Sequence, residues 1–321
     1  MKPTVTKSYD AATLAKDFPP VLKTGNLKIV YDIAKAEKAT GTVVYSRWAT
    51  MALPGKMPEG KLAVEARADF FTYDSPAKNS VEWHLNFANV DLFAYYGSGL
   101  FAQDEMQVAE HPTLASLREA LLRDKLSTLT AEGGKPTPIL IRGVQRRVRI
   151  ATDANAGEGR PNGLYGNNFG YGSADAVRRA ALAIDPPTTS NIIAIEAPSY
   201  GTGEYTAEQI RFVLSTAYTG FRAARLESEG EPRPKVVIHT GFWGCGAYGG
   251  NRVLMASLQL LASRMAEVDQ VVFHAGDEKG VGQFKEAEAL VGELGAKTAS
   301  VDEIVTRLMD KKFRWGVSDG N

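Results

Sequence analysis

The stretch that most constrains the fold of this chain runs from Lys235 to Met265. An apolar run comes first, then a loop with five glycines among the ten residues 241–250, then a segment whose apolar residues recur every three or four positions. The short apolar run predicts a buried strand, and the recurring residues predict a helix. Asn251 is a favourable N-cap, so we expect the helix to begin directly after it. The predicted order is therefore strand, glycine loop, helix.

A loop of this kind is suited to binding an anion. Glycines let the backbone adopt positive φ and approach a ligand closely, while the first turn of the helix offers unpaired N–H groups and the positive end of its dipole. We therefore expect a phosphate or pyrophosphate on residues 241–250. The alternative interpretation is a glycine-rich turn that only lets the strand and the helix pack closely.

Strands and helices alternate from Ile192 to the end of the sequence. Ile192–Ala197 and Val271–His274 are further strand candidates, and Thr206 with Gln209 predicts a capping box at the start of a helix. Such alternation implies crossover connections and a mainly parallel sheet with helices on both faces, which places the chain in the α/β class. Ligands of such sheets bind beyond the carboxyl ends of the strands. The glycine loop and residues Gln103-Asp104-Glu105 each follow a predicted strand, so they could share one crevice there.

The first quarter of the chain carries no recognisable chemistry. We expect residues 1–80 to form an N-terminal extension that packs on a core made by residues 81–321. Within the extension, the apolar patterns predict strands at Leu27–Ile33, Thr42–Trp48 and Leu62–Ala68. Glycine and proline turn signals between them suggest antiparallel connections.

Composition excludes several function classes. Lysine plus arginine equals aspartate plus glutamate, at 37 each, so general electrostatic binding of nucleic acid is not expected. A run of arginines at positions 142, 146, 147 and 149 is interpreted as the solvated face of a strand. A single cysteine excludes an internal disulfide and any site built on several cysteines.

We expect no membrane partner, because no apolar run approaches the roughly 18 residues of a membrane span. The start of the sequence also lacks the apolar core of a signal peptide. The predicted location is cytoplasmic.

The glycine loop also spells G-x-G-x-x-G from Gly244 to Gly249, between a strand and a helix. This arrangement is typical of dinucleotide-binding oxidoreductases, which makes that class one alternative. The acidic residue expected at the end of the next strand is missing, since Asp269 precedes that strand. A pyrophosphate on the loop is expected under either interpretation.

A second candidate constellation is Gln103-Asp104-Glu105, three consecutive hydrogen-bonding side chains after a glycine-containing turn. Adjacent carboxylates raise each other's pKa, and a carboxylic acid that stays protonated near neutral pH can donate its proton to a leaving oxygen. The alternative is an acidic first turn of a helix, which the helix dipole favours.

Two further groups of residues suggest chemistry and also have simpler explanations. His239 and His274 could bind a metal with Asp277, but hydrogen-bonded histidines are the more common case. Cys245 has no obvious base beside it, so packing among small residues explains it better than a nucleophilic role.

The glycine loop also carries a family resemblance. Thr240-Gly-Phe-Trp-Gly-Cys-Gly-Ala-Tyr-Gly-Gly250 resembles the T-G-N-W-G-C-G-A-F-G-G loop of the poly(ADP-ribose) glycohydrolase family. Phe87-Ala-Asn89 followed by Gln103-Asp-Glu105 is similar to that family's F-A-N and Q-E-E signatures. The resemblance covers roughly residues 81–295. It implies a macrodomain-like, three-layer α/β/α fold with a mixed, mainly parallel sheet, to which the N-terminal extension is added.

The resemblance implies a hydrolase that cleaves ribosyl O-glycosidic bonds in ADP-ribose polymers or ADP-ribosylated targets. Glu105 would be the general acid and base, and Gln103 and Asp104 would orient the ribose. No cofactor is expected; the expected partners are ADP-ribose, poly(ADP-ribose) or ADP-ribosylated macromolecules, and the chain is expected to act as a monomer. The alternative is a non-catalytic macrodomain that binds ADP-ribose or a related nucleotide.

The resemblance also assigns ligand contacts. Asn89 would contact the terminal ribose, Tyr248 would pack on it, and Gly244, Gly246 and Gly249 would carry the diphosphate. The remaining residues expected to line the ligand are Gly97, Gly99, Gly241, Cys245 and Ala247. Two departures stand out: Phe93-Ala94-Tyr95 replaces the family's first glycine tract, and Ala275 replaces the aromatic residue that stacks on adenine. Tyr165, Phe169 and Tyr171 could instead supply an aromatic platform.

Overall fold

The computed structural model describes residues 1–230, 232–294 and 299–320. Within these ranges, eight strands form one sheet, and two short strands of two residues each form a separate hairpin. The order across the sheet is β1 (Val5–Asp10), β2 (Thr42–Arg47), β7 (Ile139–Ile150), β8 (Ala181–Glu196), β4 (Ser80–Ala88), β9 (Lys235–Gly241), β10 (Gln270–His274) and β3 (Ala63–Arg67); the hairpin is β5 (Ala131–Glu132) with β6 (Lys135–Pro136). Neighbours from β8 to β3 run parallel, and those from β1 to β8 run antiparallel. The predicted mixed, mainly parallel sheet is confirmed.

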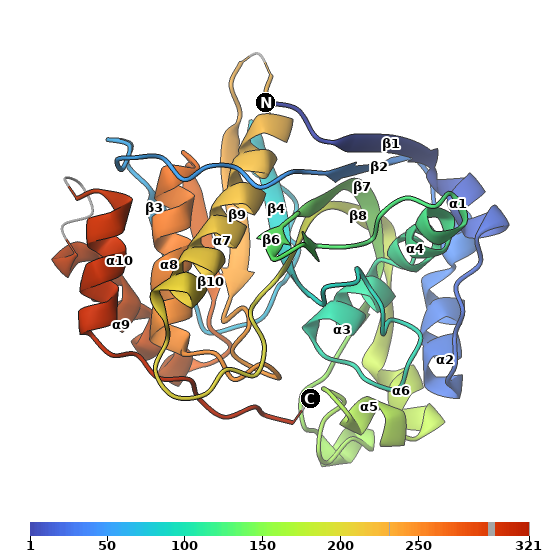
Figure 1. Ribbon diagram of the computed structural model, residues 1–321. Helices are drawn as coiled ribbons and strands as arrows, with labels where there is room; N and C mark the ends of the chain where they lie inside the picture. Colours follow the sequence, from blue (N-terminus) through green and yellow to red (C-terminus); the bar gives the residue numbers. More distant parts are fainter. Residues whose placement is uncertain (231, 295–298, 321) are drawn as a thin grey trace.

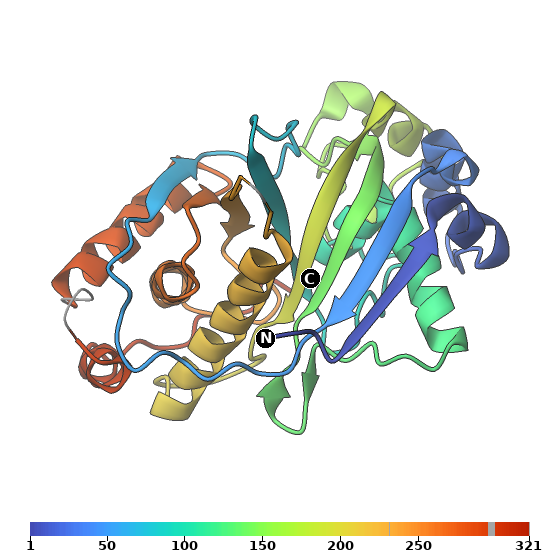
Figure 2. The same cartoon turned by 90° about the horizontal axis from the view of Figure 1, so that it is seen from above.

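Helices cover both faces of the sheet, and each face has its own hydrophobic core. Figures 1 and 2 show the gold-to-red helices on one side and the blue-to-green ones on the other. The first group is α7 (Ala207–Glu227), α8 (Arg252–Met265), α9 (Glu278–Glu293) and α10 (Val301–Asp310); the second is α1 (Ala11–Asp17), α2 (Gly25–Ala34), η1 (Ala36–Lys38), α3 (Gln103–Glu110), α4 (Thr113–Arg123), η2 (Ala156–Glu158), α5 (Asn168–Tyr171) and α6 (Ala174–Ala180). This is the three-layer α/β/α arrangement. Over the described ranges, no helix has the length and apolar character needed to cross a bilayer.

Helix starts follow the sequence signals closely. The side chains of Thr206 and Gln209 each accept the other's backbone N–H, at 3.2 and 3.0 Å, so the predicted capping box begins α7. Asn251 Oδ1 accepts from the backbone N–H of Leu254 at 3.1 Å and begins α8. Such caps satisfy N–H groups that the helix itself leaves unpaired.

Residues 1–80 contribute strands to both edges of the sheet: β1 and β2 at one edge, β3 at the other. The predicted strand at Leu27–Ile33 is wrong, because this stretch lies in α2. The Thr24 hydroxyl caps α2, and its buried residues recur at helical spacing at Leu27, Val30 and Tyr31. The expected antiparallel connection of β3 is also wrong, since β3 pairs in parallel with β10.

The arginine run on β7 is solvated only in part: Arg149 is exposed and Arg142 partly so, but the two arginines between them are buried. Arg146 and Arg147 are 5% and 9% exposed. The Arg146 guanidinium donates to Glu110 of α3 at 2.8 Å, and Glu110 also accepts the backbone N–H of Ile150 at 2.9 Å. Burial raises the pKa of the Glu110 carboxyl, and the Arg146 charge opposes that rise. An ion pair between two buried side chains therefore ties α3 to the sheet.

We predict that Arg146→Met lowers the free energy of unfolding by about 3–5 kcal/mol, because it leaves the Glu110 carboxyl buried without its cationic partner. Arg178→Met is the matched control: its exposed pair with Asp175 on α6 should contribute about 1 kcal/mol or less. Urea denaturation of both variants measures the difference. Equal losses in the two variants would contradict a structural role for the buried pair.

Candidate functional site

The site lies where two parallel strands separate. β4 pairs with β9 from Ser80 to His84, and both strands continue beyond the end of this pairing. The side chain of Gln103 satisfies the freed backbone of β4: its carbonyl accepts from Phe87 N at 2.8 Å, and its amide donates to Leu85 O at 3.1 Å. Gln103 thus holds the first residue of α3 against the end of β4.

Asp104 and Glu105 follow in the first turn of α3 and are 6% and 3% exposed. Asp104 Oδ1 accepts from Asn86 Nδ2 at 3.0 Å, and Glu105 Oε2 accepts from the backbone N–H of Ala102 at 3.1 Å. Burial raises the pKa of both carboxyls, and the neighbouring Glu105 charge raises that of Asp104 further. Burial is the larger cause of the rise at Asp104 and the raising cause at Glu105, so the predicted effect of one carboxylate on the other is found at Asp104 alone.

The glycine loop joins β9 to α8 and is attached to β8. Trp243, which is 1% exposed, donates from its indole N–H to Ile195 O at 3.1 Å. Gly244 has φ +73°, and a Cβ placed there would lie 2.4 Å from the Ala197 Cβ. A side chain at Gly244 would therefore be strained and would collide with the end of β8. Burial raises the pKa of the Cys245 thiol, which disfavours a thiolate nucleophile.

The structure brings the loop and the acidic triplet together. Asn89, just beyond β4, donates from its side-chain amide to the Tyr248 hydroxyl at 3.4 Å. The pKa of Tyr248 is raised to about 12 by burial and, to a smaller extent, by nearby carboxyls that include Glu196 and Asp104. The two motifs therefore lie at the same edge of the sheet, at the carboxyl ends of β4 and β9, as predicted.

Gly97 and Gly99 have structural neighbours of their own. A Cβ at Gly97 would lie 2.2 Å from Val21 O, and a Cβ at Gly99 would lie 3.6 Å from the Gly170 Cα. Close packing against Val21 thus accounts for Gly97, whereas a Cβ at Gly99 would make only an ordinary contact, and phosphate contact at both glycines stays a prediction. Phe93, in the place of the family's glycine tract, is 0% exposed and points into the core.

Two features of this edge were not predicted: the Glu196 carboxyl, and the closeness of Tyr165 to the acidic triplet. Glu196 ends β8 in register with Ala88 of β4, and burial raises the pKa of its carboxyl to about 7. An acidic residue ending an apolar run was the available sequence signal. Tyr165 lies close to the triplet, since its pKa is raised to about 12 by burial and then by the carboxyls of Asp319 and Glu105. No local pattern marks that proximity.

The loop residues suggested as an aromatic platform divide between core and surface. Phe169 is 0% exposed and stacks on Phe101 with ring centroids 4.0 Å apart, so it belongs to the core and that suggestion is wrong. Tyr171 is 89% exposed, and Tyr165 is 37% exposed.

The histidine pair has hydrogen-bond partners other than Asp277. His239 and His274 lie 3.1 Å apart through their ring nitrogens, and each contacts a carboxylate: Glu82 at 3.0 Å and Asp69 at 2.7 Å, respectively. Asp277 instead caps α9. Among the residues that the structure describes, no group of three or more histidine, cysteine or acidic side chains is arranged to hold a metal ion.

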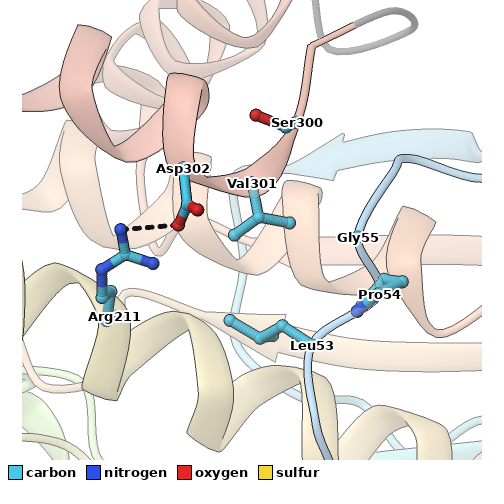
Figure 3. Close-up of a pocket in the computed structure, with 7 residues that line it drawn as sticks. All are labelled: Leu53, Pro54, Gly55, Arg211, Ser300, Val301 and Asp302. Carbon is cyan, nitrogen blue, oxygen red and sulfur yellow. Dashed lines mark ion pairs between the residues drawn. The ribbon is translucent and has the colours of Figure 1, made fainter.

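A separate hollow of about 270 Å³ lies between α7, the start of α10 and the segment before β3 (Figure 3). Its wall includes Leu53 and Val301, and an ion pair of 2.7 Å joins Arg211 to Asp302 there. None of the predicted site residues lines this hollow.

Comparison with known proteins gives one family. Residues 163–281 match the model of the family described as poly(ADP-ribose) glycohydrolase (PARG), Macro domain fold. This range contains the glycine loop and Glu196, whereas Gln103, Asp104 and Glu105 lie before it.

Solved structures similar to this chain include glycohydrolases and a macrodomain. A poly(ADP-ribose) glycohydrolase mutant from Thermomonospora curvata is 17% identical, with 88% of this chain and 84% of that chain covered and a TM-score of 0.47. The enzyme from Deinococcus radiodurans in complex with ADP-ribose is 14% identical, with 90% and 96% covered and a TM-score of 0.44. An Oceanobacillus iheyensis macrodomain with MES bound is 13% identical, with 67% and 86% covered and a TM-score of 0.40.

We predict that Glu196 makes the protein less stable as the pH rises. Its pKa is about 7 in the folded chain against an ordinary 4.5, so the folded state holds this proton more tightly than the unfolded state. The resulting stabilisation is complete below about pH 4.5 and is lost as the pH rises through about 7. Glu196→Gln cannot titrate, yet its amide oxygen can still accept a hydrogen bond.

The measurement is the free energy of unfolding of wild type and Glu196→Gln at a series of pH values from about 5 to about 8, because linkage places the change in stability there. The free energy of unfolding of the variant should increase relative to that of wild type as the pH rises. A difference that stays constant across the series would show that Glu196 has no raised pKa.

Proposed function

Because residues 163–281 match the family model described as poly(ADP-ribose) glycohydrolase (PARG), Macro domain fold, we propose that this chain belongs to that family and is a hydrolase of ADP-ribosyl groups. The bonds it cleaves are the ribosyl O-glycosidic bonds of ADP-ribose polymers or ADP-ribosylated targets. Glu105 is the general acid and base of the reaction, and the glycine loop of residues 241–250 binds the diphosphate.

The observation that carries this proposal is the position of a buried carboxyl beside an anion-binding loop. Glu105 is 3% exposed, and burial raises its pKa, which favours the protonated form that an acid catalyst needs. The hydrogen bond between Asn89 and Tyr248 links the end of β4 to the loop. A ribose bound between them would have its glycosidic bond next to the start of α3.

The reaction follows from these groups. Glu105 donates its proton to the departing oxygen, and the C–O bond breaks through a transition state with oxocarbenium character. Water then adds to the ribose carbon, and its proton passes to the Glu105 carboxylate, which restores the acid. Asp104, hydrogen-bonded to Asn86, and Gln103, hydrogen-bonded to β4, act as positioning residues.

The ligand contacts that we propose follow the same arrangement. Asn89 and Tyr248 contact the ribose, and the backbone of Gly244, Gly246 and Gly249 binds the phosphates together with the first turn of α8. The residues proposed to complete the lining are Gly97, Gly99, Gly241, Cys245 and Ala247.

A second function, binding without hydrolysis, is favoured by one observation. Glu105 Oε2 already accepts the backbone N–H of Ala102, as a capping side chain does at the start of a helix. A carboxyl held in that bond could stabilise α3 without reaching a substrate. ADP-ribose would then be bound and released unchanged.

We predict that Glu105→Gln slows release of ADP-ribose from an ADP-ribosylated protein by about 10²–10⁴-fold, the usual contribution of a general acid. The amide keeps the shape and can still accept from Ala102, so affinity for ADP-ribose should stay within about threefold. Release of labelled ADP-ribose and calorimetric binding measure the two effects.

Glu208→Gln is the matched control, because it makes the same change in the exposed first turn of α7 and should leave release unchanged. If Glu105→Gln released ADP-ribose as fast as wild type does, Glu105 would not be the general acid and base. Binding by wild type without release would establish the second function instead.

A further inference from the structure

The segment after α10 crosses the glycine loop. Residues 314–320, here called the strap, run along the carboxyl edge of the sheet from α10 to the neighbourhood of α5 (Figure 1). The strap is anchored at its start by Trp315, whose ring stacks on Tyr205 with centroids 4.3 Å apart. Trp315 N also donates to Gly203 O at 2.9 Å. These contacts fix where the strap approaches the loop.

Beyond Trp315, the strap lies directly on the glycine loop. Gly316 N donates to Gly249 O at 2.8 Å, and Asp319 N contacts Gly246 O at 3.4 Å. A Cβ placed on Gly246 would lie 2.9 Å from Asp319 Oδ2. The absence of a side chain at Gly246 therefore leaves room for a carboxylate oxygen at a position where the resemblance expects a phosphate.

The strap also reaches the other side of the crevice. Gly320 O accepts from the side-chain amide of Asn167 at 3.1 Å, just before α5. The Asp319 carboxyl is close enough to Tyr165 to raise the pKa of that phenol, and the Glu105 carboxyl raises it as well. The strap thus spans from the glycine loop to the loop that borders the acidic triplet.

The two ends of the strap differ in how firmly they are held. Trp315 is half-buried, whereas residues 316–320 are exposed and Val317 is 91% exposed. A cavity of about 380 Å³ remains between the strap and the start of α8, and its lining includes Cys245, Arg252, Gln283 and Asp319. A segment with few buried apolar contacts and solvent-exposed hydrogen bonds opens at low free-energy cost. Its far end can therefore leave the loop while Trp315 stays in place.

We propose that the strap is autoinhibitory: Asp319 lies at the anion position of the glycine loop, and a diphosphate binds there after residues 316–320 have moved away. This regulation rests on the proposed function, because the displaced carboxylate and the incoming diphosphate compete for one site. The apparent affinity for ADP-ribose is then the intrinsic affinity multiplied by the open fraction.

The test compares four forms of the protein by calorimetry with ADP-ribose and with inorganic pyrophosphate. They are wild type, Asp319→Asn, a chain ending at Val317, and the control Asp302→Asn. The control removes one negative charge at the remote hollow of Figure 3. If the strap is closed about 90% of the time, Asp319→Asn and the shortened chain bind both ligands up to about tenfold more tightly than wild type and the control. Thermal unfolding confirms that all four are folded.

Equal affinities of the four proteins for both ligands would contradict autoinhibition by the strap and would leave the proposed function intact. A different outcome is that the shortened chain binds pyrophosphate more tightly than wild type does, while none of the four proteins binds ADP-ribose. This outcome would support autoinhibition by the strap and refute the proposed function. Hydrogen exchange adds a second readout: saturating ADP-ribose should speed exchange over residues 316–320. Slower exchange would mean that the strap closes over the ligand, which would contradict competition between the Asp319 carboxylate and the diphosphate.

Discussion

The site depends on the point at which β4 and β9 stop pairing. Beyond His84, the backbone of Leu85 and Phe87 needs partners that the neighbouring strand no longer supplies, and a buried backbone group without a partner costs about 1–3 kcal/mol. The side chain of Gln103 provides both partners. The same two hydrogen bonds place the first turn of α3 at the strand end, so satisfying the sheet also positions Asp104 and Glu105.

The carboxyls around this crevice show how an acidic site can face an anion. Burial raises the pKa of Asp104, Glu105 and Glu196, so each tends toward its neutral form where a diphosphate would otherwise be repelled. In the proposed complex, the attraction would come instead from backbone N–H groups of the glycine loop and the first turn of α8. Asp319 differs from the other three because it lies on an exposed segment.

The glycine loop has a packing role that the structure shows, whereas its binding role stays a prediction. Gly244 is required by its positive φ and by the close approach of Ala197, which is the packing role. Gly246 faces the crevice and meets the strap. Glycine content alone does not separate these roles, because both need a residue without a side chain.

The sequence by itself determined the α/β class, the strand, glycine loop and helix from Lys235 to Met265, the capping box of α7, and the meeting of loop and triplet at one sheet edge. These features follow from local periodicity, capping chemistry and the rule that parallel strands share a carboxyl edge. Tertiary structure alone decided that Leu27–Ile33 is helical, that Arg146 is buried against Glu110, and that the strap covers Gly246. Each of these depends on contacts between residues far apart in the chain, and no local pattern carries that information.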